Sequence, residues 1–167
     1  NNPFSHSICS GIRLRKVSSD MNLPPTNPPT STKKAFCPVI SCLLKHEQQI
    51  LILKRSKLVG SFQGYWSCVS GYLEKGEEPL KTAYREVFEE TKIKRSDLSK
   101  VANAGPFYPE TEEVIFEAHW FLLETKNKEI NLDWEHDSYD WIDLNNLKNY
   151  KVVPWLLGMV SCLFHRA

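Results

Sequence analysis

Acidic side chains are concentrated in one short stretch of the chain, GYLEKGEEPLKTAYREVFEETKI at Gly71–Ile93. Pro79 suits the first turn of a helix, and apolar and charged positions follow it with helical spacing. At about 100° per residue, Glu86, Glu89 and Glu90 fall within an arc of about 100° on such a helix. We expect this helix to pack on a sheet through the apolar residues beside that arc, which are Leu80, Ala83, Tyr84, Val87 and Phe88.

Three carboxylates this close together raise one another's pKa unless a cation compensates them. Magnesium takes oxygen ligands, binds one or two carboxylates and leaves its other positions to water and phosphate oxygens. Arg85 lies one turn before Glu89 and can pair with it. The stretch therefore indicates a divalent-metal site acting on a phosphorylated substrate. A solvated acidic helix face is the alternative, and the glycine before the helix and Arg85 between the acids weaken it.

The rest of the chain alternates strand-like runs with polar turns, and it ends in an amphipathic helix. Lys45–Gln48 is polar and fits the turn of a hairpin. Along Val114–Leu123, apolar residues alternate with Glu117, His119 and Phe121, which predicts a half-buried face on this strand. The expected strands are Ala35–Leu44, Gln49–Arg55, Trp66–Val69, Val101–Tyr108, Val114–Leu123 and Tyr139–Ile142, followed by a short helix from Leu144 and a last helix at Val153–His165. This order predicts a mixed α/β (α+β) fold.

Bulk properties exclude several classes of protein. A chain of 167 residues, 41% hydrophobic and 25% charged, fits one ordinary globular domain. A net charge of +1 gives no overall field that would favour nucleic acid, and no apolar run reaches the roughly 20 residues of a membrane helix. The five cysteines are odd in number and lack C-x-x-C spacing, which disfavours a zinc site or a disulfide framework. We therefore expect free thiols and a reducing, cytoplasmic location.

Residues 1–34 differ in composition from the remainder. They contain six Ser, five Pro and five basic residues against the single acid Asp20. This composition predicts a disordered tail, and a mitochondrial or plastid transit segment is the alternative. The chain does not begin with methionine, so Met21 is a candidate start that would leave residues 1–20 outside the mature protein.

The acidic stretch resembles the signature of the Nudix hydrolases, G-x5-E-x7-R-E-U-x-E-E-x-G-U, where U is a bulky aliphatic residue. Eight of its nine specified positions match at the required spacing: Gly71, Glu77, Arg85, Glu86, Val87, Glu89, Glu90 and Ile93. Lys92 stands where the signature has glycine. A lysine there must adopt a left-handed conformation at a cost of roughly 1 kcal/mol, or the helix must end differently. The change therefore affects the turn rather than the chemistry.

The resemblance covers about residues 35–165, and the expected Nudix hydrolase domain is residues 35–167. Gly64–Glu77 is similar to a tryptophan-containing loop of many Nudix enzymes. Asp133–Leu144 resembles the E-H-x-x-Y-x-W segment of the MutT-like dihydroneopterin triphosphate pyrophosphatases and of some archaeal Nudix domains. The resemblance implies a mixed sheet sandwiched between helices. It also implies a pyrophosphohydrolase that cleaves a nucleoside diphosphate linked to another group by attack of water on phosphorus.

The family pattern implies roles for individual residues. Glu86, Glu89, Glu90 and the Gly71 carbonyl would hold Mg²⁺ or Mn²⁺, while Arg85 would orient the glutamates together with Glu77.

The general base varies within the family, and Glu135 is the candidate here. An equal alternative is that Glu135 is only an exposed acid on a loop. Glu112 and Glu113 are lesser candidates. Arg55 is expected to contact phosphate and Trp66 to stack on a base, although a charged strand end and a core tryptophan remain the alternatives.

The expected partner is a small nucleotide or nucleoside diphosphate derivative, without membrane and without nucleic acid; a homodimer stays open. Two other functions also remain open. One is an inactive Nudix-fold module that binds or senses a nucleotide. The other is an isomerase on the same fold, which the complete hydrolase signature disfavours.

Overall fold

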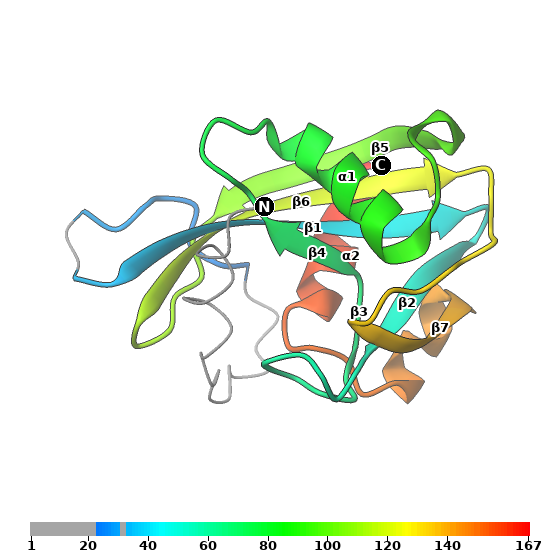
Figure 1. Ribbon diagram of the computed structural model, residues 1–167. Helices are drawn as coiled ribbons and strands as arrows, with labels where there is room; N and C mark the ends of the chain where they lie inside the picture. Colours follow the sequence, from blue (N-terminus) through cyan, green and yellow to red (C-terminus); the bar gives the residue numbers. More distant parts are fainter. Residues whose placement is uncertain (1–22, 31–32) are drawn as a thin grey trace.

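The computed structural model describes residues 23–30 and 33–167. These residues form a seven-stranded mixed sheet with α1 on one face and α2 on the other (Figure 1). The sheet order is β3-β2-β1-β6-β5, with β4 paired to β1 and β7 paired to β2. The elements are β1 (Ala35–His46), β2 (Gln49–Arg55), β3 (Trp66–Ser67), β4 (Val69–Tyr72), α1 (Pro79–Thr91), β5 (Leu98–Phe107), β6 (Val114–Thr125), β7 (His136–Asp143) and α2 (Leu156–Arg166), with short 3-10 helices at Arg95–Asp97 and Leu144–Asn149.

The centre of the sheet is the parallel pair β1 and β6, which runs from Ala35 opposite Val114 to Lys45 opposite Glu124. Along each strand, successive side chains point to opposite faces of the sheet. Leu122 joins the apolar cluster under α2, whereas Phe121 and Leu123 join the cluster under α1. Glu117 and His119 are partly exposed and alternate with the buried Ala118 and Trp120, as the pattern predicts, whereas Phe121 is buried and departs from it. Helices cover both faces, and such strands are apolar on both sides.

The hairpin of β1 and β2 is confirmed, with His46 opposite Gln49. The run expected as one strand at Trp66–Val69 is instead divided: β3 pairs with β2, and β4 pairs with β1. Through its pairing with β1, β4 lies beside α1.

Two helices differ in detail from the sequence expectation. α2 begins at Leu156 rather than Val153, so Pro154 precedes the helix instead of lying in its first turn. On α1, Val87 is buried as expected, but Phe88 is 47% exposed and was wrongly assigned to the packing face. The ammonium of Lys92 lies 5.6 Å from the Phe88 ring centroid and covers part of that ring.

Lys92 ends α1 in the left-handed conformation, with φ 64° and ψ 10°, and its N–H donates to the Phe88 carbonyl at 2.9 Å. The chain therefore keeps the turn that the signature glycine would provide. We expect Lys92→Gly to stabilise the protein by about 0.5–1 kcal/mol, since glycine adopts positive φ without the clash of a Cβ. Urea unfolding would measure the change. Lys94→Gly is the control, because Lys94 has φ −78°, and it should give no gain.

The expected tail falls mostly on residues 1–22 and 31–32, which lie outside the described residues. In the part of the tail that the structure describes, the Pro25 carbonyl accepts a hydrogen bond from the Tyr108 N–H at 2.7 Å. Within the described chain, Cys42, Cys68 and Cys162 are free thiols. No helix in that part of the chain is long and apolar enough to cross a membrane.

Candidate active site

The loop before α1 is closed by Glu77. Its Oε2 accepts from the Glu74 N–H at 3.0 Å, from the Thr82 hydroxyl at 3.0 Å and from Arg85 Nη2 at 3.4 Å. The backbone hydrogen bond from Glu74 is the main cause that lowers the pKa of Glu77. Glu77 therefore joins the loop to the first turns of the helix, and Thr82 is a partner that the signature does not specify.

Arg85 joins that loop to the glutamates of the helix. Its Nη1 donates to Glu86 Oε1 at 3.0 Å and to Glu89 Oε1 at 3.2 Å. The second contact is the expected pairing across one helical turn. Glu89 is half-exposed at its side chain, whereas that of Glu86 is only 12% exposed. One guanidinium thus holds two carboxylates that would otherwise repel each other.

Gly71 lies directly against Glu86. A Cβ added to Gly71 would overlap the carboxyl carbon of Glu86, so glycine is required here for close approach. Burial raises the pKa of Glu86 to about 7, with Glu89 and Glu135 adding to the effect and Arg85 opposing it. The end of β4 and the middle of α1 are therefore in close contact where Gly71 packs against the Glu86 carboxylate.

Glu90 lies on the buried face of α1 and is 1% exposed. Among the described residues, neither of its carboxylate oxygens has a hydrogen-bond partner. Burial raises its pKa well above the usual range, and Glu135, Glu86 and Asp133 add to the rise; the Ser70 backbone opposes it but does not reach hydrogen-bond geometry. An uncompensated buried carboxylate is costly, and such groups mark functional sites.

Two residues distant in sequence lie near these glutamates. Arg55 ends β2, and its Nε donates to the Ser61 carbonyl at 3.0 Å. Burial lowers the pKa of Arg55, while the negative charges of Glu135 and Glu90 oppose that shift. Glu135 precedes β7 and is brought here because β7 pairs with β2. The structure thus gathers Glu86, Glu90, Glu135 and Arg55 in one region.

Trp66 lies elsewhere. It pairs with Lys54 in the ladder of β2 and β3, one position away from Arg55, and neighbouring positions face opposite sides of a sheet. The Trp66 ring packs against the cluster under α2, with Tyr150 at 5.2 Å between ring centroids. It therefore lies on the face away from α1, and its role as a substrate contact stays a prediction.

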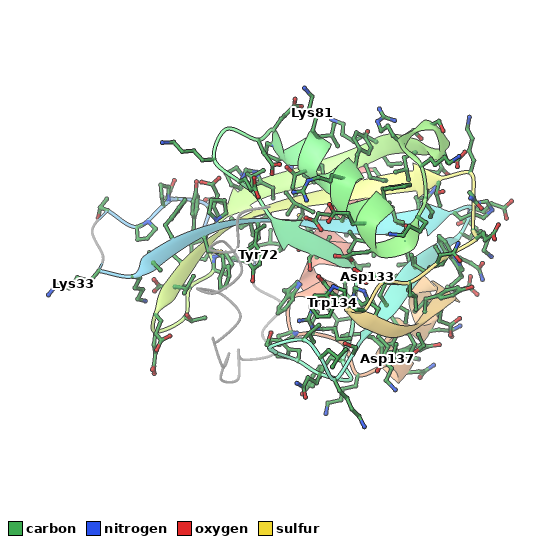
Figure 2. All side chains as sticks on the ribbon, in the orientation of Figure 1. Lys33, Tyr72, Lys81, Asp133, Trp134 and Asp137 are labelled. Carbon is green, nitrogen blue, oxygen red and sulfur yellow. The ribbon has the colours of Figure 1, made fainter. Side chains whose placement is uncertain are left out.

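Sequence reasoning missed Asp133, which lies on the loop between β6 and β7 (Figure 2). The Asn131 N–H donates to the Thr91 carbonyl at 3.0 Å, which ties this loop to the end of α1. An aspartate two residues before Glu135 is a spacing typical of side chain–backbone turns, and that signal was available.

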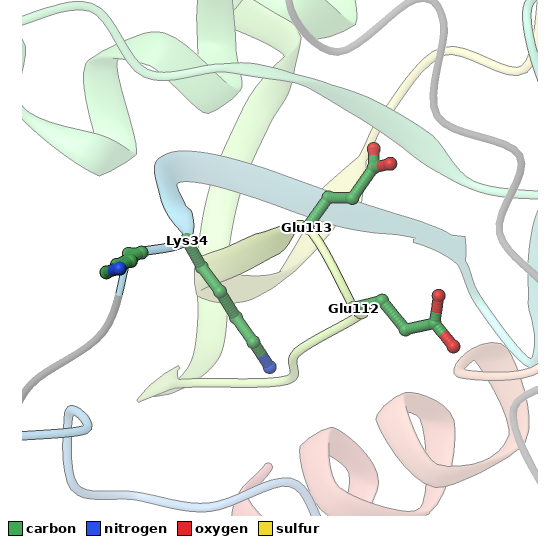
Figure 3. Close-up of a pocket in the computed structure, with 4 residues that line it drawn as sticks. Lys34, Glu112 and Glu113 are labelled. Carbon is green, nitrogen blue, oxygen red and sulfur yellow. The ribbon is translucent and has the colours of Figure 1, made fainter.

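Glu112 and Glu113 line an open hollow with Lys33 and Lys34 (Figure 3). The hollow opens beside the start of β1, where Ala35 N–H donates to the Glu113 carbonyl at 2.9 Å. It contains none of the α1 glutamates. These two acids are therefore poorer candidates for a base than Glu135.

The carboxylates suit a hard divalent cation, although the ligands are not preassembled. In residues 23–30 and 33–167, no three His, Cys, Asp or Glu side chains already converge in a metal-binding arrangement. Arg85 occupies Glu86 and Glu89, so both would turn from it to bind. The unpaired Glu90 oxygens and an oxygen-only donor set fit Mg²⁺ or Mn²⁺.

Among models of protein families, the one described as NUDIX domain matches residues 36–161 of the chain. The chain belongs to the Nudix family. The expected fold class is also confirmed, because solved Nudix structures share this mixed sheet with flanking helices.

Several curated Nudix relatives resemble the chain in sequence. An RNA pyrophosphohydrolase of Pelagibacter ubique is 26% identical over 125 residues, covering 66% of this chain and 77% of its own. A dihydroneopterin triphosphate diphosphatase of Haemophilus influenzae is 28% identical, and the match covers 59% of this chain and 67% of that protein. The asymmetrical bis(5'-nucleosyl)-tetraphosphatase of Mus musculus is 35% identical, and the match covers 48% of this chain and 56% of that protein.

Solved structures show the same fold at low sequence identity. A MutT protein from Methanosarcina mazei Go1 has a TM-score of 0.62 and 23% identity, covering 77% of this chain and 91% of its own. A binary complex of the C. elegans Ap4A hydrolase has a TM-score of 0.59 and 18% identity, and the match covers 69% of this chain and 85% of that chain.

Proposed function

We propose that this Nudix protein is a Mg²⁺- or Mn²⁺-dependent pyrophosphohydrolase. It cleaves a phosphoric anhydride bond in a nucleoside diphosphate linked to another group. The observation that carries the proposal is the buried Glu90 carboxylate, which has no hydrogen-bond partner among the described residues and lies near Glu86 and Glu135. A cation close by lowers the cost of burying this charge, and a phosphorylated substrate supplies the remaining oxygen ligands.

Each residue has a physical role in this reaction. Glu86, Glu89, Glu90 and the Gly71 carbonyl would hold the cation, which when bound lowers the pKa of water and neutralises charge on the phosphoryl oxygens. Arg85 holds Glu86 and Glu89 in place until the cation binds.

The remaining two residues act on water and phosphate. Glu135 accepts a proton from the attacking water. The new P–O bond then replaces the anhydride P–O bond, and the leaving phosphate keeps the electron pair. Arg55 is suited to bind phosphate oxygens.

The relatives act on different molecules by name, so the substrate is a question for experiment. A panel of dinucleoside polyphosphates, nucleotide sugars, ADP-ribose and (d)NTPs would be incubated with the protein and Mg²⁺, with products identified by mass. Water labelled with ¹⁸O would place the label on a product phosphate. Saturable nucleotide binding without turnover would instead indicate a binding or sensor module.

Glu135→Gln should reduce kcat by about 100-fold, because a general base contributes on this order. The loss should be smaller than that caused by removing a metal ligand. Glu129→Gln is the control, since Glu129 is an exposed acid on the same loop. An unchanged rate for Glu135→Gln would remove this residue from the mechanism.

A further inference from the structure

The backbone of Glu135 is held at both of its polar groups. Its N–H donates to the Asp133 carboxylate at 3.2 Å, and its carbonyl accepts from the Ser56 N–H at 2.8 Å. The first contact closes a turn of the kind that aspartate forms with the backbone two residues later. A backbone held at both of its polar groups fixes the position from which the Glu135 side chain extends.

A bulge in the neighbouring ladder supports the same arrangement. Lys54 pairs with Ser138 and Arg55 pairs with His136, so Asp137 has no counterpart on β2. An extra residue of this kind redirects the strand and often occurs next to active sites. Here it brings Glu135 opposite Ser56, whereas a regular ladder would place His136 there.

Asp133 itself is mostly enclosed, with its side chain 18% exposed. Its Oδ1 lies 3.4 Å from His136 Nδ1, but this contact lacks hydrogen-bond geometry. Burial lowers the pKa of His136, which favours the neutral ring and leaves no full ion pair. The well-formed contact of the Asp133 carboxylate is therefore the one with the Glu135 backbone.

We propose that Asp133 is a positioning residue, which fixes the backbone of Glu135 so that the Glu135 carboxylate faces the reacting water. The inference rests on the proposed function of the same site. Asp133 acts through its side-chain oxygen as a hydrogen-bond acceptor, rather than through its charge or as a metal ligand. Misplacing a catalytic group by about 1 Å can reduce a rate by about 100-fold, so such a support is expected to matter for kcat.

The test compares Asp133→Ala, Asp133→Asn, Glu135→Gln and the double variant Asp133→Ala/Glu135→Gln with the wild type. Asp133→Ala should lower kcat by about 10- to 100-fold with KM and the Mg²⁺ activation constant unchanged. Asp133→Asn keeps the acceptor oxygen and should recover most of that loss. In the Glu135→Gln background, Asp133→Ala should cause no further loss, because the carboxylate that it positions is already absent.

Asn127→Ala is the matched control. Asn127 Oδ1 accepts from the Glu129 N–H at 2.9 Å and closes the same kind of turn earlier on the same loop. Its removal should leave kcat unchanged. If Asp133→Ala does not fold, Asp133→Ser replaces it, since a serine hydroxyl accepts the same hydrogen bond more weakly and should give an intermediate kcat.

Amide hydrogen exchange provides a readout that does not depend on activity. The Glu135 amide should be protected in the wild type and in Asp133→Asn, and lose protection in Asp133→Ala. Lack of protection in the wild type would overturn the positioning role. Equal losses of kcat for Asp133→Asn and Asp133→Ala, or additive losses with Glu135→Gln, would also overturn it. A wild type that hydrolyses nothing in the panel would refute the proposed function instead.

Discussion

Replacing Glu89 by glutamine is expected to abolish Mg²⁺-dependent hydrolysis, with a loss of at least about 1,000-fold in kcat, while the protein stays folded. The side chain of Glu89 is 51% exposed, and its Oε1 accepts a hydrogen bond from Arg85 at 3.2 Å. An exposed pair of this kind contributes only about 0–1 kcal/mol to stability. The same carboxylate is a proposed metal ligand, and charge neutralisation at phosphorus accounts for much of such catalysis.

The measurement is the initial rate at saturating Mg²⁺, together with circular dichroism to verify folding. Glu78→Gln is the matched control, because Glu78 is an exposed acid at the start of the same helix and pairs with Lys81 at 3.7 Å. It should retain the wild-type rate. Wild-type turnover by Glu89→Gln would show that Glu89 does not bind the metal.

Replacing Glu90 by glutamine is expected to abolish the same activity, yet to stabilise the metal-free protein by about 1–3 kcal/mol at pH 8. The reason is that the Glu90 carboxylate is buried without a hydrogen-bond partner in the described part of the chain. A neutral amide of the same shape costs less to bury than a charge. A gain of this size would raise Tm by roughly 3–10 °C.

The advantage of Glu90→Gln should depend on pH. The pKa of Glu90 in the folded protein is raised above the usual value of 4.5, mainly by burial. The folded state therefore holds this proton more tightly than the unfolded state. Its contribution to stability is complete below about pH 4.5 and is lost as pH rises through the folded pKa. The difference in Tm between the variant and the wild type should thus grow from pH 5 to pH 8.

Thermal unfolding in a chelator across this pH range would measure the effect. Added Mg²⁺ should raise the Tm of the wild type, because a ligand that binds only the folded state stabilises it, and should leave Glu90→Gln nearly unchanged. Glu89→Gln is the comparison, since the Glu89 side chain is 51% exposed and its replacement removes no buried carboxylate. A Glu90→Gln protein less stable than the wild type at pH 8 would mean that Glu90 is compensated without metal.

Much of the fold was predictable because it depends on local patterns. The hairpin of β1 and β2 follows from two apolar runs separated by a polar turn, and α1 follows from helical spacing after Pro79. The pairing of β1 with β6 was not predictable, because it joins residues about 80 positions apart and leaves no local pattern. The exposure of Phe88 depended on which side of α1 met the sheet.

The family, the fold class and the contacts within α1 follow from the sequence alone. Arg85 reaches Glu89 because the helical repeat places residues four apart on one side, and that repeat is a property of the backbone. The left-handed end of the helix at Lys92 likewise follows from a signature position.

Which of three similar glutamates is fully buried depends on the tertiary structure. Glu90 lies on the face of α1 that packs on the sheet, whereas Glu89 is half-exposed, because the packing of the helix on the sheet selects one side. Pairing of β7 with β2 then brought Glu135 and Asp133 to that glutamate. Burial and long-range pairing depend on elements distant in the chain, whereas the helical repeat depends only on neighbours.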